Sequence, residues 1–282
     1  MSASAEQIRN QQRGIWDEFS AGWRKWDAEV LGWHAPFGDA LIEEVRLRPN
    51  SRVIDVASGT GEPGLTAASL VPDGSVTLTD LSEGMLRVAG EKAAARGLDN
   101  VRTAVCDVAA LPFEDGSFDA VLCRFGFMFF PSLSGALREM ARTAGPGARI
   151  SAAVWSRAAE NPWAGLILGT IARHTELPVP PAGAPGLFRC AAQGYMTRVF
   201  EDAGLRDVTE RKISTDMVHA SPEVYWEFMT DVAAPVVLGL ANADKASREL
   251  IRSDVFQMLS RYEYDGAIRL RSTATIVAGT RA

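Results

Sequence analysis

The sequence has few of the residues on which disulfide-bonded and metal-binding proteins depend. Its 282 residues include three cysteines and three histidines. Cys106, Cys123 and Cys190 are odd in number, and the first two lie in apolar runs that predict buried strands, so a disulfide framework is not expected. No C-x-x-C or H-x-x-x-H spacing is present, and we expect no protein-bound metal. This composition suits a reducing cytoplasm, where we expect the protein to reside.

Basic residues are also in the minority. The chain has 29 lysines and arginines against 35 aspartates and glutamates, a formal net charge of -6 and a pI near 5.3. Nucleic-acid-binding proteins concentrate basic residues because these replace the counterions of the phosphates. We therefore expect neither DNA nor RNA as a partner.

Long apolar runs are missing as well. The first residues are polar and contain no apolar signal core, and the longest apolar run, residues 232–241, is short and interrupted by a proline. We expect neither secretion nor membrane anchoring. With 47% hydrophobic and 23% charged residues, the chain can bury one large core, or a core and a smaller cap.

The most informative segment that the sequence does contain is VIDVASGTGEPG, residues 53–64. Its first residues suit a buried parallel strand, while Gly59 and Gly61 allow a sharp turn and a close approach to a ligand. Glu62 and Pro63 fit the first turn of a helix, where an acid opposes the positive end of the helix dipole and proline loses no useful N–H. The segment therefore predicts a strand, a ligand-binding loop and a helix. No G-x-S-x-G nucleophile elbow and no internal repeat accompany it.

Read literally, this segment also contains the dinucleotide-binding pattern G-x-G-x-x-G. Gly59, Gly61 and Gly64 form the pattern, and Asp80 follows about 20 residues later, as in enzymes that bind NAD(P). Two features disfavour this interpretation. Asp55 precedes the first glycine within the strand, and about fifty residues precede the strand, whereas a dinucleotide domain usually starts with it.

Two further apolar runs end at an acid. SVTLTD ends at Asp80, and Ser82 behind it can cap the next helix. VRTAVCD ends at Asp107, and a fourth strand over Phe118–Cys123 follows a turn at residues 114–117. Because open α/β sheets bind ligands beyond the carboxyl ends of their strands, we expect these acids and the glycine loop to form one site.

This order of motifs resembles the class I S-adenosylmethionine-dependent methyltransferases. The string Asp55-Val56-Ala57-Ser58-Gly59-Thr60-Gly61 is similar to their motif I, an apolar strand and an acid followed by x-G-x-G-T-G, with Ala57 where the family most often has glycine. The acid-ended strands, the string DGSFDAVLCRFGF and the ending Pro146-Gly147 resemble the ubiquinone/menaquinone-biosynthesis-type branch. The resemblance extends from Arg52 to about Trp155.

The resemblance implies an α/β fold: a Rossmann-like seven-stranded sheet with helices on both faces, in which strand seven runs antiparallel between strands five and six. It implies S-adenosylmethionine as cofactor and S-adenosylhomocysteine as product, with Asp80 accepting the ribose hydroxyls, Asp107 the adenine amino group, and Arg124 and Phe125 beside the methionine moiety. Asp55 either contacts the ligand or braces the loop. The expected cofactor-binding residues are Asp55, Ala57, Ser58, Gly59, Thr60, Gly61, Asp80, Leu81, Met85, Cys106, Asp107, Val108, Arg124 and Phe125.

Aromatic residues before and after the core are candidates for a substrate pocket. Trp16, Phe19, Trp23 and Trp26 recur at spacings of three and four, which places them on one face of a helix. This face either packs over the core or roofs the cofactor and lines an acceptor pocket, as in the resembling family. The expected pocket residues are Trp16, Phe19, Trp23, Phe127 and Met128, with ordinary core packing as the alternative for the last two.

The rest of the chain carries no comparable motif. We expect an N-terminal helical segment or lid at 1–48, the cofactor-binding core at 49–156, further core elements with an inserted helical cap at 157–269, and the final strand at 270–282. Within the last parts, the pattern predicts helices at Trp163–His174 and Gln193–Asp202, a loop or hinge at 177–186, strand six at Val208–Met217, helices over Pro222–Tyr262 broken at Pro235, and strand seven at Leu270–Ala278.

The predicted function is methyl transfer to a small, largely apolar or aromatic metabolite, such as a quinone, a phenol or a specialised natural product. A general base is needed only for some acceptors, and His34, His174, His219 and Tyr195 are candidates between which the sequence does not choose. The alternatives are an NAD(P)-dependent oxidoreductase and a non-catalytic S-adenosylmethionine-binding scaffold. Whether carbon, oxygen or nitrogen is methylated, and whether the protein is a monomer or a homodimer, stay open.

Overall fold

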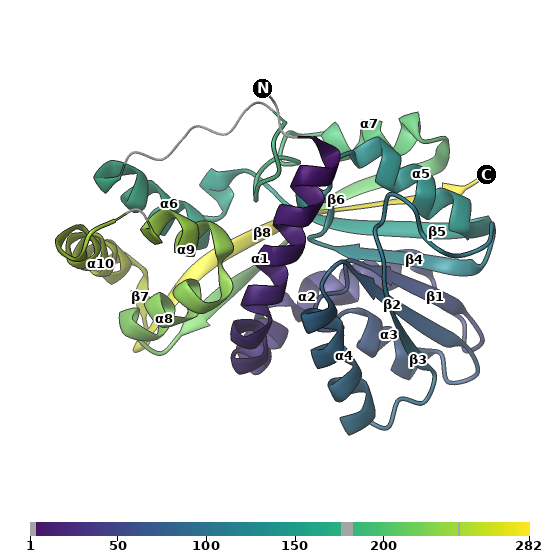
Figure 1. Ribbon diagram of the computed structural model, residues 1–282, viewed down its shortest axis with the longest axis horizontal. Coiled ribbons are helices and arrows are strands. Elements are labelled where there is room, and N and C mark those ends of the chain that lie inside the picture. The colour runs from purple at the N-terminus through teal and green to yellow at the C-terminus, as the bar shows by residue number, and fades with distance from the viewer. Residues whose placement is uncertain (1–3, 176–182, 242) are drawn as a thin grey trace.

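One twisted sheet runs through the whole length of the molecule (Figure 1). The computed structural model describes residues 4–175, 183–241 and 243–282, and in these residues the sheet has eight strands in the order β3-β2-β1-β4-β5-β8-β6, with β7 paired to β8. The strands are β1 (Arg52–Val56), β2 (Ser75–Asp80), β3 (Val101–Val105), β4 (Phe118–Arg124), β5 (Ala144–Trp155), β6 (Leu205–His219), β7 (Glu263–Tyr264) and β8 (Ala267–Arg281).

The direction of the strands agrees with the predicted topology. Strands β1 to β5 pair in parallel, whereas β8 runs antiparallel to both of its long neighbours, β5 and β6. The carboxyl ends of β1, β2, β3 and β4 therefore meet at one edge. The predicted antiparallel strand between strands five and six is confirmed.

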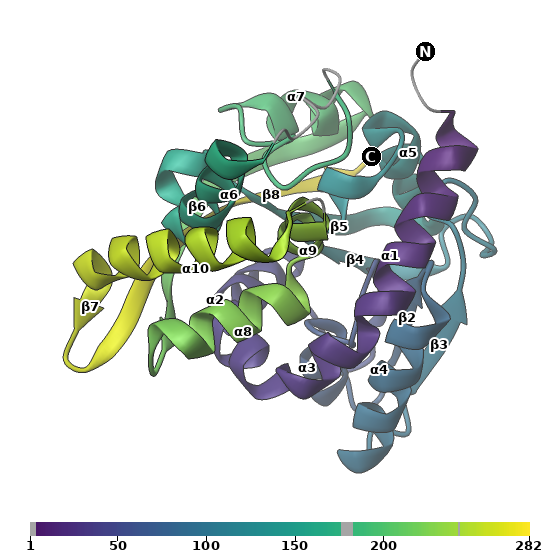
Figure 2. The same ribbon diagram turned by 60° about the vertical axis from the view of Figure 1, so that its left-hand side comes forward.

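Helices cover both faces of this sheet (Figure 2). One cluster of buried residues joins α2, α3 and α4 to β1 and β2. A larger cluster joins α5 and α7 to β4 and β5, and it continues into α6, α8, α9 and α10. The α-helices are α1 (Ala5–Lys25), α2 (Asp27–Val45), α3 (Gly64–Leu70), α4 (Glu83–Ala95), α5 (Leu133–Thr143), α6 (Pro162–His174), α7 (Tyr195–Asp202), α8 (Pro222–Val232), α9 (Ala234–Ala241) and α10 (Lys245–Leu259). The short 3-10 helices are η1 (Phe127–Phe129), η2 (Ala158–Glu160) and η3 (Ser260–Tyr262).

Side-chain caps fix where the helices nearest the strand ends begin. The Ser82 hydroxyl accepts a hydrogen bond from the Met85 amide at 3.0 Å and so starts α4 directly behind β2. At α1, Ser4 and Gln7 form a reciprocal capping box. The Ser82 cap is the local reason that α4 follows the end of β2 so closely.

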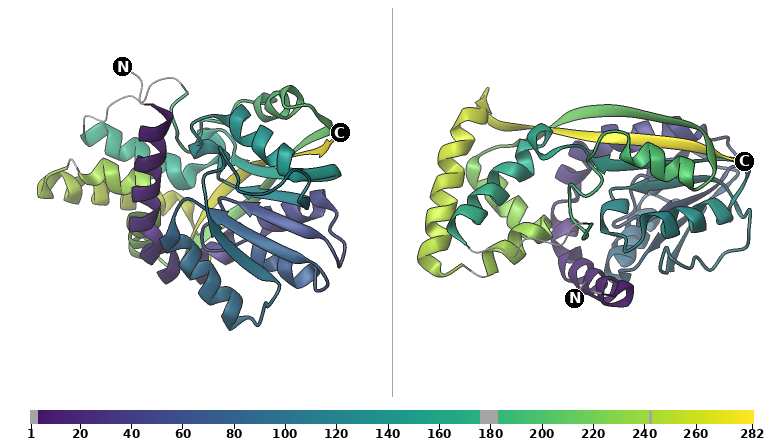
Figure 3. Two further views of the ribbon diagram at one scale, coloured as in Figure 1. Left: turned by 45° about the vertical axis from the view of Figure 1, so that its right-hand side comes forward. Right: turned by 90° about the horizontal axis from the view of Figure 1, so that it is seen from above.

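Strands β6 and β8 are longer than the pattern predicted, by two or three residues at each end. Trp155, the last residue of β5, pairs with Ala274, and β6 and β8 continue together beyond that point to His219 and Ile268. The extension is visible in Figure 3 as a two-stranded ribbon that leaves the core. Helices α6, α8, α9 and α10 gather around it, and we call this part the cap.

The structure contains one strand that the sequence analysis missed. Residues Glu263–Tyr264 form β7, a short hairpin partner of β8, where the pattern predicted that the helices simply end. Asp265 and Gly266 connect the two strands with φ values of 52° and 70°. An Asp-Gly pair with two positive φ angles is the usual sequence of a tight hairpin turn, so the signal was present in the sequence.

The helices break at Ala233, two residues before the predicted break at Pro235: α8 ends at Val232, and α9 begins at Ala234 with Pro235 in its first turn. Of the predicted loop at 177–186, residues 177–182 lie outside the described residues. Nowhere in the described ranges is a single helix both long and apolar enough to cross a membrane, and α8 with α9 satisfies length and composition only as a pair bent by 90°.

Candidate cofactor-binding site

The side chain of Asp55 stabilises the loop after β1. This side chain is fully buried, and its Oδ2 accepts a hydrogen bond from the Gly64 amide at 2.8 Å, which ties the end of β1 to the start of α3. Burial raises the pKa of the Asp55 carboxyl to about 8, partly offset by the Arg124 guanidinium. In the structure Asp55 braces the loop, and its Oδ1 has no hydrogen-bond partner among the described residues.

Gly59 and Gly61 of this loop have different surroundings. Gly59 has a φ of +54°, and a Cβ added there would meet no atom within 4 Å. A Cβ added at Gly61, where φ is +104°, would lie 2.7 Å from Leu65 Cδ1 and 3.1 Å from Ala89 Cβ. Gly59 therefore faces open space where a ligand fits, whereas Gly61 is required by packing against α3 and α4.

Ala57 occupies a backbone conformation that favours glycine. Its φ is +56°, in the left-handed region that costs a residue with a Cβ roughly 1 to 2 kcal/mol. A Cβ added at Gly126, behind β4, would lie 2.7 Å from the Ala57 Cβ. The close approach of the loops after β1 and β4 explains why a residue no larger than alanine fits here.

Asp80 connects the end of β2 to the glycine loop. Its Oδ2 accepts a hydrogen bond from the Gly59 amide and its Oδ1 accepts one from the Ser82 amide, each at 2.9 Å. Burial raises the pKa of the Asp80 carboxyl, while these amides act in the opposite direction. Each carboxylate oxygen keeps a lone pair, so Asp80 can bind hydroxyls beside Gly59 without releasing the loop.

Asp107 lies two residues beyond the end of β3 and is bound by a residue that the sequence analysis did not single out. Its Oδ2 forms an ion pair with Arg9 Nε of α1 at 3.0 Å, and its Oδ1 accepts from the Ala109 amide at 2.9 Å. Cys106 beside it is half-buried, and burial raises the pKa of its thiol to about 11. The α1 helix therefore reaches the end of β3.

A second contact fixes α1 over the start of α4. Asp17 Oδ1 accepts a hydrogen bond from the Ser82 hydroxyl at 2.6 Å and from the Gly84 amide at 3.2 Å. Together with the Arg9–Asp107 pair, this contact lays α1 across the ends of β2 and β3. Arg9 and Asp17 belong to no sequence motif, so their contacts could be found only in the folded structure.

Arg124, the last residue of β4, and Phe125, which follows it, lie in different surroundings. Arg124 lies next to Gly38 of α2 and lines a small cavity of about 20 Å³ with Glu62 and Pro63, on the α2 side of the loop. Phe125, with a φ of +62°, stacks on Trp155 at 4.0 Å between ring centroids and lies 5.1 Å from His34. The aromatic ring, rather than the guanidinium, therefore joins the cluster at the strand ends.

His34 sits inside an aromatic cluster at the carboxyl edge of the sheet. Its ring centroid lies 4.2 Å from that of Trp33 and 5.7 Å from that of Trp155, and its exposed fraction is only 3%. Neither ring nitrogen has a hydrogen-bond partner in the described part of the chain. Burial, with a contribution from Arg124, lowers the pKa of His34 well below its ordinary value, which keeps the imidazole neutral.

The predicted substrate-pocket residues fall into two groups. Trp16 and Trp23 are half-buried and Phe19 is buried on α1, where Trp16 packs edge-on against Phe129 at 5.3 Å. Phe127 and Met128 are fully buried, and the Met128 sulfur accepts a hydrogen bond from the Trp155 amide at 3.4 Å. The first group covers the strand ends, while the second is packed inside the core, and a pocket role for either stays a prediction.

The remaining predicted cofactor residues lie along the same edge. Their burial ranges from half-buried to nearly complete, and the Ser58 hydroxyl has no partner among the described residues. They are Ser58, Thr60, Leu81, Met85 and Val108.

Comparisons with known proteins agree with this geometry. Residues 53–147 match the family described as "Methyltransferase domain". The chain is 38% identical over 157 residues to a demethylmenaquinone methyltransferase of Thermus thermophilus, an alignment that covers 56% of this chain and 59% of that protein. The α/β core is a class I S-adenosylmethionine-dependent methyltransferase domain. In sequence it is similar to methyltransferases of the ubiquinone/menaquinone biosynthesis type.

Other similar proteins match more of the chain than residues 53–147. An uncharacterized protein of Mycobacterium tuberculosis is 36% identical over 168 residues, which cover 60% of this chain and 58% of that protein. The alignments thus span less than two thirds of the curated relatives that the chain matches. The crystal structure of the YcgJ protein from Bacillus subtilis superposes with a TM-score of 0.58, covering 88% of this chain and 99% of that chain at 18% identity.

The residues of the methyltransferase domain fit S-adenosylmethionine. The space in front of Gly59 is free of protein atoms where a Cβ would project, and the Asp80 carboxylate beside it has unused lone pairs for ribose hydroxyls. The Ser58 hydroxyl is buried without a partner among the described residues, as expected of a group that awaits a ligand.

Proposed function

We propose that this protein transfers a methyl group from S-adenosylmethionine to a small, largely apolar or aromatic acceptor. The observation that carries the proposal is the pairing of Gly59 and Asp80 at the carboxyl edge of the sheet, inside the domain matched over residues 53–147. Open α/β sheets bind ligands at this edge. When bound, S-adenosylmethionine supplies an electrophilic methyl group on a sulfonium, with a neutral thioether as the leaving group.

The contribution of the chain is positioning and exclusion of water. The loop at 57–61, Asp80 and Asp107 would hold the cofactor, while α1 lies over the ends of β2 and β3 through Arg9 and Asp17. Alignment of reacting groups supplies roughly 7 to 11 kcal/mol in favourable cases. We therefore expect no covalent intermediate on the protein.

The aromatic cluster next to the cofactor loop supports an apolar or aromatic acceptor. Behind the end of β4, Phe125 contacts Trp155 and His34, and Trp33 contacts both of these rings from the other side. Stacked and edge-on rings offer flat apolar surfaces to a planar ligand. The similar protein of Thermus thermophilus is named a demethylmenaquinone methyltransferase, which makes a hydroquinone the first acceptor class to test.

Among the four candidate bases, His34 has the best-supported position. It contacts Phe125 of the predicted cofactor site, and both its ring nitrogens lack partners in the described residues. His174 instead pairs with Asp254 at 2.8 Å on the cap, and His219 lies at the far end of β6. We propose His34 as the residue that hydrogen-bonds the acceptor, with its proton-accepting role dependent on the acceptor.

The test is direct detection of methyl transfer. Purified protein is incubated with S-adenosylmethionine and a panel of hydroquinones, phenols and arylamines, and S-adenosylhomocysteine and methylated products are measured by mass spectrometry. Formation of both, lost in Asp80→Ala, supports the proposal. Binding of S-adenosylhomocysteine without any product would support a scaffold, and oxidation or reduction of a nicotinamide cofactor would support a dehydrogenase.

A further inference from the structure

A second cavity lies outside the cofactor site, between the first half of α2, the end of β6 and α8. Its volume is about 260 Å³. No residue of the glycine loop lines it. Because β6 continues past the end of β5, the cavity belongs to the junction of core and cap.

The polar groups around this cavity are acidic or neutral. Glu29 and Asp216 are exposed carboxylates at its lining, and no lysine or arginine lines it. Arg271 Nε lies 3.9 Å from Asp216 Oδ1, a loose pair between two exposed side chains that contributes little. Glu29 forms no ion pair within the described part of the chain. The cavity is therefore electronegative.

A buried, unpartnered imidazole also lines the cavity. His219 has an exposed fraction of 4%, and its Nε2 has no hydrogen-bond partner among the described residues. Burial lowers the pKa of His219 to about 4, so its ring is neutral and adds no positive charge at neutral pH. A buried polar atom without a partner is rare in folded proteins and marks a place where a ligand atom would bind.

Two fixed aromatic rings complete the lining. Trp33 Nε1 donates to Ser272 Oγ at 2.9 Å, and the Trp33 ring stacks on Trp155 at 5.5 Å, which holds it in one orientation. Phe228 lies edge-on to Trp33 at 6.1 Å and contacts His219 at 4.8 Å. Because these rings are already held in one orientation, little conformational entropy would be lost from them when a ligand binds.

We propose that this cavity binds a small organic cation, an ammonium group carried on a flat or short apolar body. Carboxylates attract the ammonium, aromatic faces bind both the cation and the apolar body, and His219 offers a hydrogen-bonding nitrogen. No three of the His, Cys, Asp and Glu residues within the described ranges could hold a metal ion together, so the occupant is an organic cation rather than a metal ion. The site does not depend on methyl transfer.

The test compares three ligands of similar shape and different charge by calorimetric titration of the full-length protein. The probes are 2-phenylethylamine, 2-phenylethanol and 3-phenylpropionate at neutral pH. We expect the amine to bind about tenfold more tightly than the alcohol, because each of the two exposed carboxylates contributes about threefold, and we expect the carboxylate to bind most weakly. Added salt should reduce the preference for the amine. Equal binding of amine and alcohol, or tighter binding of the carboxylate, would overturn the proposal.

Variants assign the binding to this cavity. Glu29→Gln and Asp216→Asn should each weaken the amine about threefold and leave the alcohol unchanged. Gly32→Leu should fill the cavity and remove binding of all probes, because Gly32 lines it and a Cβ there meets no atom within 4 Å. The matched control is Gly169→Leu on α6, another exposed helical glycine with free space that does not line the cavity. Amine binding that survives Gly32→Leu would also overturn the proposal.

Discussion

The core and the cap of this protein share one sheet but differ in how their residues are specified. In the core, each strand between β1 and β4 ends at or near a residue with a defined task, such as Asp55, Asp80 or Asp107. In the cap, β6 and β8 continue as a ribbon whose role is to carry helices α6, α8, α9 and α10. The difference shows that the strand ends and the glycine loop of the core leave a signature in the sequence, whereas the packing of the cap leaves only an apolar pattern.

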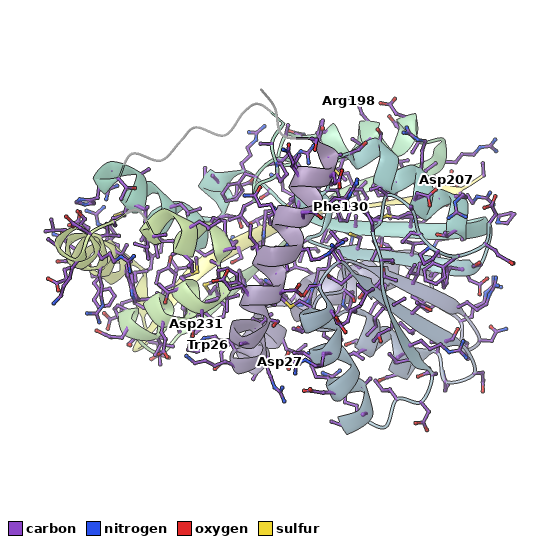
Figure 4. The ribbon with its side chains drawn as sticks, in the orientation of Figure 1. Trp26, Asp27, Phe130, Arg198, Asp207 and Asp231 are labelled. Atoms are coloured by element: carbon purple, nitrogen blue, oxygen red, sulfur yellow. The ribbon has the colours of Figure 1, made fainter. Side chains whose placement is uncertain are left out.

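The two parts are joined by α1 and α2. Arg9 and Asp17 of α1 contact the core, while Trp23 Nε1 donates to the Val232 carbonyl at 3.2 Å and Trp26 Nε1 donates to Asp231 Oδ2 at 2.9 Å in the cap. Figure 4 shows Trp26 and Asp231 next to each other where α1 meets α8. Helix α1 therefore contacts both the cap and the strand ends beside the cofactor loop.

The largest expected difference between core and cap is the direction of their pH dependence. The folded pKa of Asp55 is raised by burial to about 8 from 3.8, so the folded core keeps a proton that the unfolded chain loses. Its contribution to stability is lost as pH rises from about 4 to about 8. At 1.36 kcal/mol per unit of pKa, the effect is on the order of several kcal/mol. In denaturant titrations across this range, Asp55→Asn should lose less stability than the wild type.

Burial of His219 in the cap changes stability with pH in the opposite direction. Its folded pKa of about 4 lies below the ordinary value of 6.5 for histidine, so over this pH range the unfolded chain binds a proton that the folded cap does not. Its contribution is present above about pH 6.5 and lost as pH falls to about 4. His219→Phe should therefore reduce the loss of stability on acidification. If Asp55→Asn and His219→Phe changed the pH profile in the same direction, this comparison would fail.

The next effect separates the two glycines of the core loop. Gly61→Ala should destabilise the fold by about 3 kcal/mol, because the new Cβ meets Leu65 and Ala89 at a strained φ. Gly59→Ala should cost only about 1 kcal/mol in stability but weaken S-adenosylhomocysteine binding, since its Cβ projects into the open space. Thermal unfolding and calorimetric titration of both variants distinguish them. Equal loss of stability would contradict the separate roles.

Removal of the Asp80 carboxylate tests the ligand side of the core. Asp80→Ala should reduce affinity for S-adenosylhomocysteine by roughly 1.5 to 3 kcal/mol, since it removes charge-assisted hydrogen bonds to the ribose and the acceptor for the Gly59 amide. Asp119→Ala is the control, because Asp119 pairs with the exposed Arg52 at the start of β1. An unchanged affinity in Asp80→Ala would remove this residue from the site.

The smallest expected change in stability concerns the contact between α1 and the cap. Asp231→Ala should destabilise the protein by about 1 to 2 kcal/mol, because Trp26 has an exposed fraction of 8% and its Nε1 would lose its partner. Glu227→Ala removes only an exposed ion pair with Lys25 and should cost less than about 0.5 kcal/mol. Equal unfolding free energies for the two variants would show that the buried tryptophan bond does not hold the cap.

The sequence predicted the core well because strand, acid and glycine must follow one another closely along the chain. The loop at 53–64, the acid at the end of β2 and the antiparallel position of β8 were all predicted, the last from the resemblance. The contacts of Arg9 with Asp107 and of Asp17 with Ser82 were not, because they join residues far apart in sequence that belong to no motif.

Predictions for the cap were less complete for a physical reason. The extensions of β6 and β8 are stabilised by pairing with each other and by covering helices, so their ends are set by tertiary contacts and not by local pattern. The short β7 is different, since its turn at Asp265-Gly266 has a recognisable sequence. The proposed division of the chain at residues 48, 156 and 269 stays a prediction.

The central claim is that the core binds S-adenosylmethionine at Gly59 and Asp80. The most direct test is calorimetric titration of the protein with S-adenosylhomocysteine, with NADH and NADPH in parallel and Asp80→Ala as the matched variant. The account predicts one site for S-adenosylhomocysteine, weakened in the variant, and no binding of either nicotinamide. Binding of NADH or NADPH in place of S-adenosylhomocysteine would contradict it and would make the glycines of residues 59–64 a dinucleotide-binding loop.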